Sequence, residues 1–240
     1  MKKRILAVAV ASLLGASLAF AEGVKVQTVS DRIILFNVPF ACPAAPEIGC
    51  GSRSKPALLE LQHQPGIAEA WLNGTGTVLA VVGTEDSNRE SRVKTVQSIL
   101  EKNGAAATEL TGENREAELK SFVLHHDWYR GGEVDSLSKQ EAEIVAARLV
   151  RRVQGKVPLS EGNAKALESG LAQVISDGFI GKTDEKPEFA QELLKVARKN
   201  LDEMGVAAFQ EAIAKGYRPQ AEDNEGTKSR TPDCCSIKAI

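Results

Sequence analysis

The chain has 240 residues, with 30 basic and 32 acidic side chains and a formal net charge of −2. A slightly acidic chain lacks the basic surface that attracts nucleic acids or anionic membranes, so neither is expected as a partner. The length is enough for one large domain or two small ones, and a change of composition near residue 120 favours two.

The first 21 residues have the pattern of an export signal. Lys2, Lys3 and Arg4 precede an apolar stretch, and Ala19-Phe20-Ala21 matches a signal-peptidase cleavage site. The apolar stretch is shorter than the roughly 20 residues that a membrane-spanning helix needs. We therefore expect a signal peptide at 1–21, a short lead at 22–30, and a periplasmic or secreted protein that does not insert into the membrane once the signal is removed.

Residues 31–118 are predicted to form the first domain. Apolar periodicity and turn residues predict, in order, a strand, a helix, a hairpin of two strands around Asn73-Gly74, a second helix and a last strand. The expected ranges are 31–40, 55–64, 66–72, 77–82, 91–103 and 105–110. This β-α-β-β-α-β order is that of a ferredoxin-like domain, so the fold class expected here is α+β.

Two cysteines, Cys42 and Cys50, bracket the loop between the first strand and the first helix. The unpaired amides and the dipole at a helix N-terminus favour a thiolate over a thiol, which would prepare Cys50 for a metal ion. Thiolates are soft ligands and suit Cu(I), whereas zinc prefers about four ligands and the loop adds only Glu47. In an oxidising compartment the pair could instead form a structural disulfide, and redox catalysis is a third alternative.

Residues around the first and second strands resemble a known family. Val38-Pro39 followed by a cysteine, and Pro65-Gly66-Ile67 leading into the second strand, resemble the heavy-metal-associated domains of periplasmic mercury-binding proteins and of copper chaperones and pumps. The similarity covers about residues 31–112. It implies Cys42 and Cys50 as ligands for Hg(II) or Cu(I), although the family's two cysteines are separated by two residues and these are separated by seven.

Residues 119–216 are predicted to form a helical bundle. Four amphipathic segments follow one another: the first opens on a capping box of Ser138 and Glu141, Ser160 caps the second, Pro187 opens the third, and 206–215 form a short fourth. Three basic residues of the first helix are expected to face solvent, namely Arg148, Arg151 and Arg152. No catalytic motif is present in the bundle, and we expect a binding protein rather than an enzyme.

Residues 217–240 are polar and rich in turn-forming residues, which predicts a flexible tail. Cys234 and Cys235 stand next to each other near its end, and this resembles the vicinal cysteine pair near the C-terminus of mercuric reductase. The resemblance implies a second or relay metal site on a mobile arm. The alternative is an intermolecular disulfide or simple oxidation.

Together these patterns predict an exported protein that sequesters or transfers Hg(II) or Cu(I). Cys42 and Cys50 would hold the ion, and Cys234 and Cys235 would pass it on to a membrane transporter or a reductase. No organic cofactor is expected. The alternatives are an exported thiol-disulfide redox protein, and an interaction module that disulfides staple together.

Overall fold

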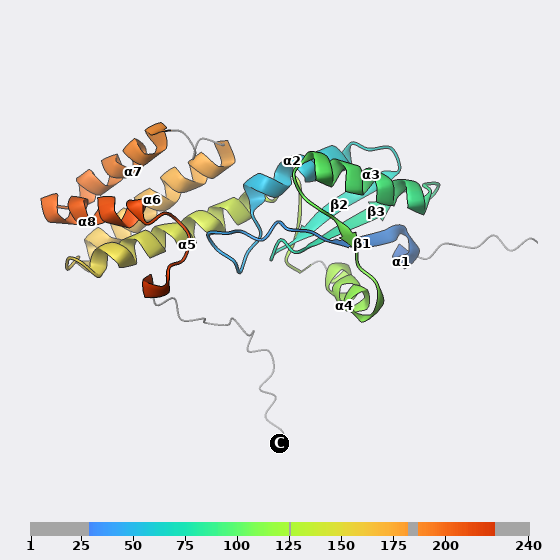
Figure 1. Ribbon diagram of the computed structural model, residues 1–240, viewed down its shortest axis with the longest axis horizontal. Helices are drawn as coiled ribbons and strands as arrows, with labels where there is room; N and C mark the ends of the chain where they lie inside the picture. The colour runs from blue at the N-terminus through green and yellow to red at the C-terminus, as the bar shows by residue number, and fades with distance from the viewer. Residues whose placement is uncertain (1–28, 125, 182–186, 224–240) are drawn as a thin grey trace, which may run out of the picture.

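The computed structural model describes residues 29–124, 126–181 and 187–223, and it divides into a sheet half and a helical half that lie end to end (Figure 1). The strands are β1 (Ile33–Asn37), β2 (Ile67–Asn73), β3 (Val78–Gly83), β4 (Thr108–Glu109) and β5 (Trp128–Arg130). The helices are α1 (Val29–Arg32), α2 (Gly51–Gln62), α3 (Arg89–Lys102), α4 (Gly112–Val123), α5 (Asp135–Gln154), α6 (Glu161–Gly181), α7 (Pro187–Asn200) and α8 (Glu203–Ala214), followed by a 3-10 turn, η1 (Ala221–Asp223).

The five strands form one antiparallel sheet in the order β4-β1-β3-β2-β5. β1 lies inside the sheet, which explains why its apolar run is continuous: Ile33, Ile34, Leu35 and Phe36 are all buried. The predicted hairpin is confirmed. The Asn73 side-chain oxygen accepts hydrogen bonds from the Thr77 and Val78 amides at 2.9 and 3.0 Å and so closes the turn between β2 and β3.

The sheet departs from the expected ferredoxin-like βαββαβ arrangement. The α+β class is confirmed. The chain adds α1 before β1, α4 after β4, and then a fifth strand, β5, which pairs with β2. β5 covers an edge of β2 that would otherwise expose its amides and carbonyls. It is held there by Trp128, which is buried and packs edge-to-face on Phe122 of α4 with ring centroids 5.1 Å apart. The sheet half therefore extends to Arg130, past the expected boundary at residue 118.

The two faces of the sheet carry different cores. One core lies under α2 and α3 and includes Phe36, Leu58, Leu79 and Leu100. The smaller core on the opposite face lies under α4 and includes Leu35, Ala80 and Phe122. α3 begins at Arg89, two residues before the expected start, because Asn88 caps it, and Gly104, with φ of 71°, follows its end as expected.

The second half is a bundle of α5, α6, α7 and α8, in which each helix packs against two others. Two of its helix starts have the expected chemistry: Ser160 Oγ accepts the Asn163 amide at 3.2 Å, and α7 begins at Pro187. The prediction of a capping box at the start of α5 was wrong. α5 begins at Asp135, one turn earlier than expected, so Ser138 and Glu141 lie inside the helix and are buried.

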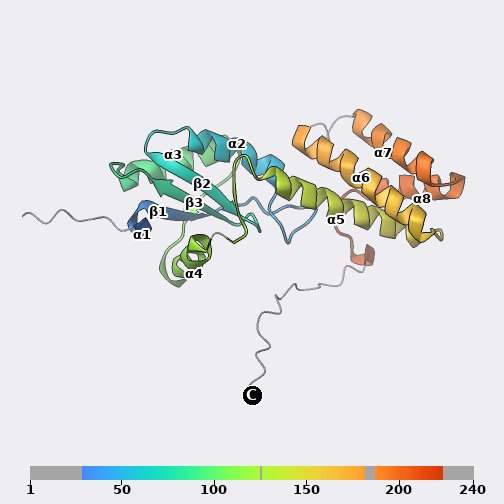
Figure 2. The same cartoon turned by 180° about the vertical axis from the view of Figure 1, so that it is seen from behind.

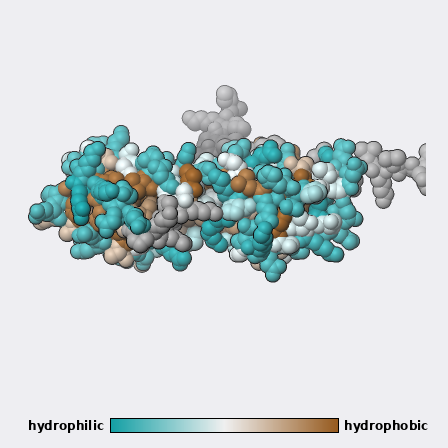
Figure 3. Space-filling view, turned by 90° about the horizontal axis from the view of Figure 1, so that it is seen from above, coloured by the Kyte–Doolittle hydropathy of each residue, from teal (hydrophilic) through white to brown (hydrophobic). Residues whose placement is uncertain are grey.

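α5 connects the two halves, and Figure 2 shows from behind how it runs from the sheet into the bundle. Its start joins the sheet core through Leu137, and its later turns join the bundle core through residues such as Val145 and Leu149. The bundle core also contains Cys42 and Cys50 from the loop after β1. Seen from above, hydrophilic residues cover most of the surface and hydrophobic residues form separate patches over the two halves (Figure 3).

The expected solvent-facing arginines behave differently. Arg151 is exposed, but Arg148 is only 1% exposed and donates to the Ala44 and Tyr217 carbonyls at 2.7 and 2.5 Å. Arg152 forms a two-pronged ion pair with Asp223, each contact 2.7 Å long. The acceptors come from distant parts of the chain, which a local pattern does not reveal.

These contacts also correct the expected start of the tail. Residues 217–223 are fastened to α5 by Arg148 and Arg152 rather than forming the beginning of a free tether. The signal peptide expected at 1–21, residues 22–28, and the stretch 224–240 with Cys234 and Cys235 lie outside the described residues. None of the helices within the described ranges is both long and apolar enough to cross a membrane.

Candidate functional site

The loop from Val38 to Cys50 folds back on itself and brings its two cysteines together. The Cys50 amide donates to the Phe40 carbonyl at 2.7 Å, and the Cys42 amide donates to the Ile48 carbonyl at 2.8 Å. Between these two bonds, Ala41 and Gly49 pair as an isolated antiparallel bridge. A seven-residue separation is therefore compatible with a close pair of sulfurs, because the backbone closes the loop.

The turn between β2 and β3 holds this loop in place through backbone hydrogen bonds. The Gly49 amide donates to the Gly74 carbonyl at 2.7 Å, and the Phe40 amide donates to the Gly76 carbonyl at 2.9 Å. A side chain on Gly76 would meet the Phe40 carbonyl oxygen at 2.4 Å, and its φ of +72° also favours glycine. The close approach of two backbones thus fixes the loop that carries the thiols.

Cys42 is 1% exposed, and its sulfur is held by the backbone of its own loop. The amides of Ala44 and Ala45 both donate to Cys42 Sγ at 3.3 Å. Such donors stabilise negative charge on sulfur, so they lower the free energy needed to ionise this thiol in a closed site.

Cys50 is the N-cap residue of α2, directly at the helix start rather than several residues before it as expected from Pro56. Its sulfur makes a 3.5 Å contact with the Ser52 hydroxyl. The hydrogen bond from the Cys42 thiol, assisted by Ser52 and by the Arg53 amide and charge, lowers the pKa of Cys50 to about 6 although burial opposes this shift. Helix N-termini favour thiolates for the same reason.

The two thiols therefore act as a unit, with one proton held between them near neutral pH. The pKa of Cys42 is raised, first because its proton is bound to the Cys50 sulfur, and further by burial and by the neighbouring Glu141 carboxylate. Both residues are free thiols. A pair with one thiolate and one hydrogen-bonded thiol can bind a soft cation or exchange with a disulfide.

α5 covers the two cysteines and shields them from solvent. A side chain on Gly51 would meet the Val134 carbonyl oxygen at 2.1 Å and Ser138 Oγ at 2.6 Å, so the start of α2 lies directly against α5. Further along α5, Glu141 is beside Cys42, and Arg148 holds the Ala44 carbonyl. Cys42 is 1% exposed and Cys50 is 5% exposed. A ligand can therefore reach the sulfurs only when α5 and the loop separate.

Sequence analysis named the two cysteines that this loop brings together, but not the side chains that surround them. Ser138, Glu141 and Arg148 were assigned to a cap and to a solvated face, and all three are buried. The signal that could have revealed them is their spacing, because residues 134, 138, 141, 145 and 148 recur every three or four positions and share one face of a helix. Cys234 and Cys235 lie outside the described residues.

The donor set around the pair is small. Among the described residues, no group of three or more His, Cys, Asp or Glu side chains is arranged to hold a metal ion. Glu47, the extra oxygen ligand that the loop could offer, is exposed. What remains at this position is a pair of sulfurs with the buried Glu141 carboxylate beside one of them.

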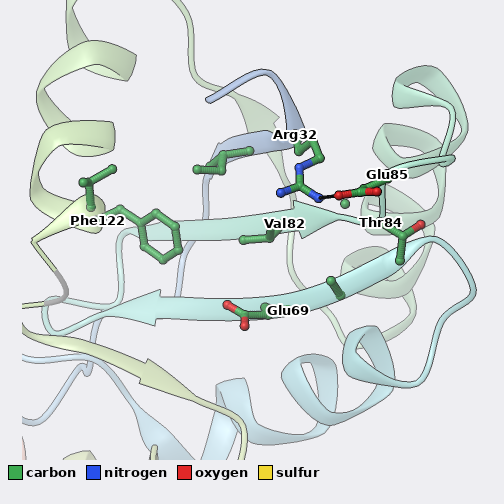
Figure 4. Close-up of a pocket in the computed structure, with 10 residues that line it drawn as sticks. Arg32, Glu69, Val82, Thr84, Glu85 and Phe122 are labelled. Carbon is green, nitrogen blue, oxygen red and sulfur yellow. Dashed lines mark ion pairs between the residues drawn. The ribbon is translucent and has the colours of Figure 1, made fainter. Parts of the chain in front are cut away.

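An open cavity of about 540 Å³ lies away from the thiol pair, on the sheet face beside α4 (Figure 4). Val82 and Phe122 supply apolar surface there, and the rim carries an ion pair of 3.5 Å between Arg32 and Glu85. No cysteine lines it, so it is separate from the thiol pair.

Comparison of the chain with protein-family models, with curated proteins and with solved structures found no match.

Proposed function

We propose that this protein is an exported binding protein that holds one soft metal ion, Hg(II) or Cu(I), between Cys42 and Cys50. The observation that carries the proposal is the pair of buried free thiols on one closed loop, in which a hydrogen bond from Cys42 lowers the pKa of Cys50 to about 6. At neutral pH the site already contains a thiolate, so a cation that enters when α5 and the loop separate meets a ligand ready to bind it.

The chemistry of loading needs one further proton loss. The cation bonds to the Cys50 thiolate, the Cys42 thiol then releases its proton to solvent, and the second metal–sulfur bond forms. The Ala44 and Ala45 amides support the second thiolate. Two sulfurs are sufficient for Cu(I) or Hg(II) in linear coordination, whereas a structural zinc site requires about four ligands.

We also infer that β1, α2, β2, β3, α3 and β4 constitute a ferredoxin-like core of the heavy-metal-associated kind, to which β5 and α4 are added. The inference is supported by the order of these elements and by the neighbours β4-β1-β3-β2 in the sheet. Both cysteines lie between β1 and α2, where the family that the sequence resembles carries its ligands.

Cys234 and Cys235 would act as the relay that exchanges the ion with the buried pair. The fastened segment 217–223 passes close to the cysteine loop, since one guanidinium, that of Arg148, binds both the Tyr217 and the Ala44 carbonyls. Cys234 is eleven positions after Asp223, which limits the reach to about 37 Å at about 3.4 Å per residue. That distance is comparable with the size of one half of the molecule. The ion would then pass by thiolate exchange to a membrane transporter or a reductase.

The test is anaerobic titration of the reduced mature chain with Hg(II) and with Cu(I). We expect one tightly bound ion in the variant with Cys234→Ser and Cys235→Ser, and loss of that ion when Cys42→Ser or Cys50→Ser is added. Equal stoichiometry with and without Cys42 and Cys50 would overturn the proposal.

A second candidate function is thiol-disulfide exchange, which the contact between a thiolate and a thiol also favours. The Cys50 thiolate would attack a partner disulfide, form a mixed disulfide and release one partner thiolate. Cys42, after losing its proton, would displace the second thiolate, so the pair is oxidised and the partner is reduced. A reduction potential in the range of thiol oxidoreductases, together with no metal uptake, would favour this function over the first.

A further inference from the structure

A small cavity at the N-terminus of α3 has the composition of an anion site. Its volume is about 180 Å³, and it is lined mainly by small polar residues and one arginine: Pro65, Gly66, Ile67, Ser87, Asn88, Ser91, Arg92 and Thr95. It lies on α3 and the segments before β2 and α3, and none of the residues of the thiol site takes part in it.

Arg92 is the feature that points to a ligand. It is 4% exposed, and among the described residues no carboxylate pairs with it. Its Nη1 donates to the carbonyl and the hydroxyl of Ser87, while its Nε has no acceptor there and its Nη2 makes no hydrogen bond to a described atom. Burying a cation without a partner is costly, and a bound anion would remove that cost.

Neighbouring charges increase the positive potential at this position. Burial, followed by the charges of Arg89 and Arg32, lowers the pKa of Arg92. Arg89 pairs with Glu109 and Arg32 with Glu85, so the carboxylates within reach are taken up by other arginines. Asp86 and Glu90 are the remaining acidic neighbours along the chain, and both are exposed, where water and salt screen them.

The start of α3 supplies further donors. Asn88 Oδ1 accepts the Ser91 amide at 3.0 Å, and the Arg92 amide already bonds to the Asn88 carbonyl. Arg89 and Glu90 are not lining residues of the cavity, but their amides belong to the first turn of α3, which has no acceptor within the helix. Helix N-termini with free amides bind phosphate and similar anions.

We propose that this cavity binds a single tetrahedral oxyanion, of the phosphate or sulfate class, with Arg92 as the charged donor. Ser91 and Thr95, which both carry a hydroxyl, are among the other lining residues. The volume suits one phosphoryl or sulfuryl group and not a nucleotide. The site is independent of the cysteines and of what they bind.

The experiment uses inorganic phosphate and, in parallel, sodium sulfate as probes of the full mature chain, with sodium chloride of matched ionic strength as the baseline. Calorimetric titration should show saturable binding of an oxyanion to the wild type. Arg92→Gln should weaken it by at least about tenfold, because a charge-assisted hydrogen bond is lost. Arg89→Gln, which removes an exposed arginine of the same helix, should leave most of the affinity intact.

Absence of saturable binding in the wild type would overturn the proposal, as would equal losses in the Arg92 and Arg89 variants. If Arg92→Gln does not fold, Ser91→Ala decides the matter, since Ser91 is exposed and its loss should not unfold the chain. Weakened binding in Ser91→Ala supports the site, and unchanged binding contradicts it. A response to phosphate alone would identify a phosphoryl group, and equal responses would identify a general oxyanion.

Discussion

At the scale of single residues, the site depends on how two thiols divide one charge. Cys50 has the helix N-terminus and the Cys42 proton, whereas Cys42 has two backbone amides but also a buried carboxylate beside it. The negative charge is therefore assigned to Cys50, and Cys42 keeps its proton until a stronger electrophile arrives.

The first prediction concerns the pH dependence of this thiolate. The alkylation rate of Cys50 by iodoacetamide, followed by mass mapping, should rise with a midpoint near pH 6, because the pKa of Cys50 is lowered to about 6. Cys42→Ala removes the hydrogen bond and should move the midpoint toward the ordinary thiol range. The free energy that this thiolate contributes to folding is present above the unfolded pKa and is lost as the pH falls through about 6. A midpoint near 8.5 in the wild type would contradict the assignment.

A second residue-scale prediction concerns Asp223. Its hydrogen bonds to Arg152 lower its pKa from the ordinary 3.8 to about 2, and both side chains are almost fully buried. A shift of this size corresponds to about 2 kcal/mol of stability, present above pH 4 and lost as the pH falls through about 2. Asp223→Asn should therefore lower the free energy of unfolding in urea at pH 7 by about 2 kcal/mol.

The control for that measurement is the adjacent Glu222. Glu222 forms an exposed ion pair of 2.8 Å with Lys215, and water and salt screen such pairs so that they contribute little to stability. Glu222→Gln should change stability by much less than Asp223→Asn. Equal effects of the two substitutions would show that the Arg152 pair is not what fastens this segment.

At the scale of elements, the strongest local patterns predicted individual elements correctly, although the sheet departs from the expected ferredoxin-like arrangement. The β2–β3 hairpin follows from Asn73-Gly74, and α7 from Pro187 and its apolar stripe. α4 and β5 were missed for physical reasons: α4 buries only Phe122, which leaves no periodic stripe, and β5 is three residues long. The candidate thiols could be named from sequence because helix starts and paired cysteines are local features. Their burial under α5 could not, since it depends on contacts between residues about 100 positions apart.

The contact between α2 and α5 gives a prediction at this scale. Gly51→Ala would place a carbon 2.1 Å from the Val134 carbonyl oxygen, so α5 must move away. Overpacking of this kind costs about 1–3 kcal/mol, and the wider gap should also speed the alkylation of Cys42. Urea unfolding and timed labelling measure the two effects.

Gly162→Ala is the matched control. It also lies in the first turn of a helix, but an added carbon there meets no atom within 4 Å. Its stability and its labelling rate should be unchanged or slightly improved. Unaltered stability in Gly51→Ala would mean that α5 does not press on the start of α2.

At the scale of the whole molecule, sheet and bundle should unfold together. The bundle core includes Cys42, Ala44, Ala45 and Cys50 from the sheet half, and α5 contributes to both cores. Contacts of this kind couple neighbouring units into one cooperative transition.

The two tryptophans, Trp71 and Trp128, allow this to be tested, because both belong to the sheet half. Tryptophan fluorescence therefore reports on the sheet, whereas circular dichroism at 222 nm is dominated by the helices. The two denaturation curves should coincide in the wild type. Arg148→Met removes the donor to the buried Ala44 carbonyl and the half-buried Tyr217 carbonyl, and it should separate the curves. Separate transitions in the wild type would contradict the coupling.

Because α5 contributes to both cores, it also constrains how such a protein can evolve. A chain cut after Arg130 would leave the cysteine loop without its cover, and a bundle inherited alone would lack the loop residues that fill its centre. Gene fusion or domain shuffling therefore cannot exchange either half without the other. Sheet and bundle have to be inherited as one unit.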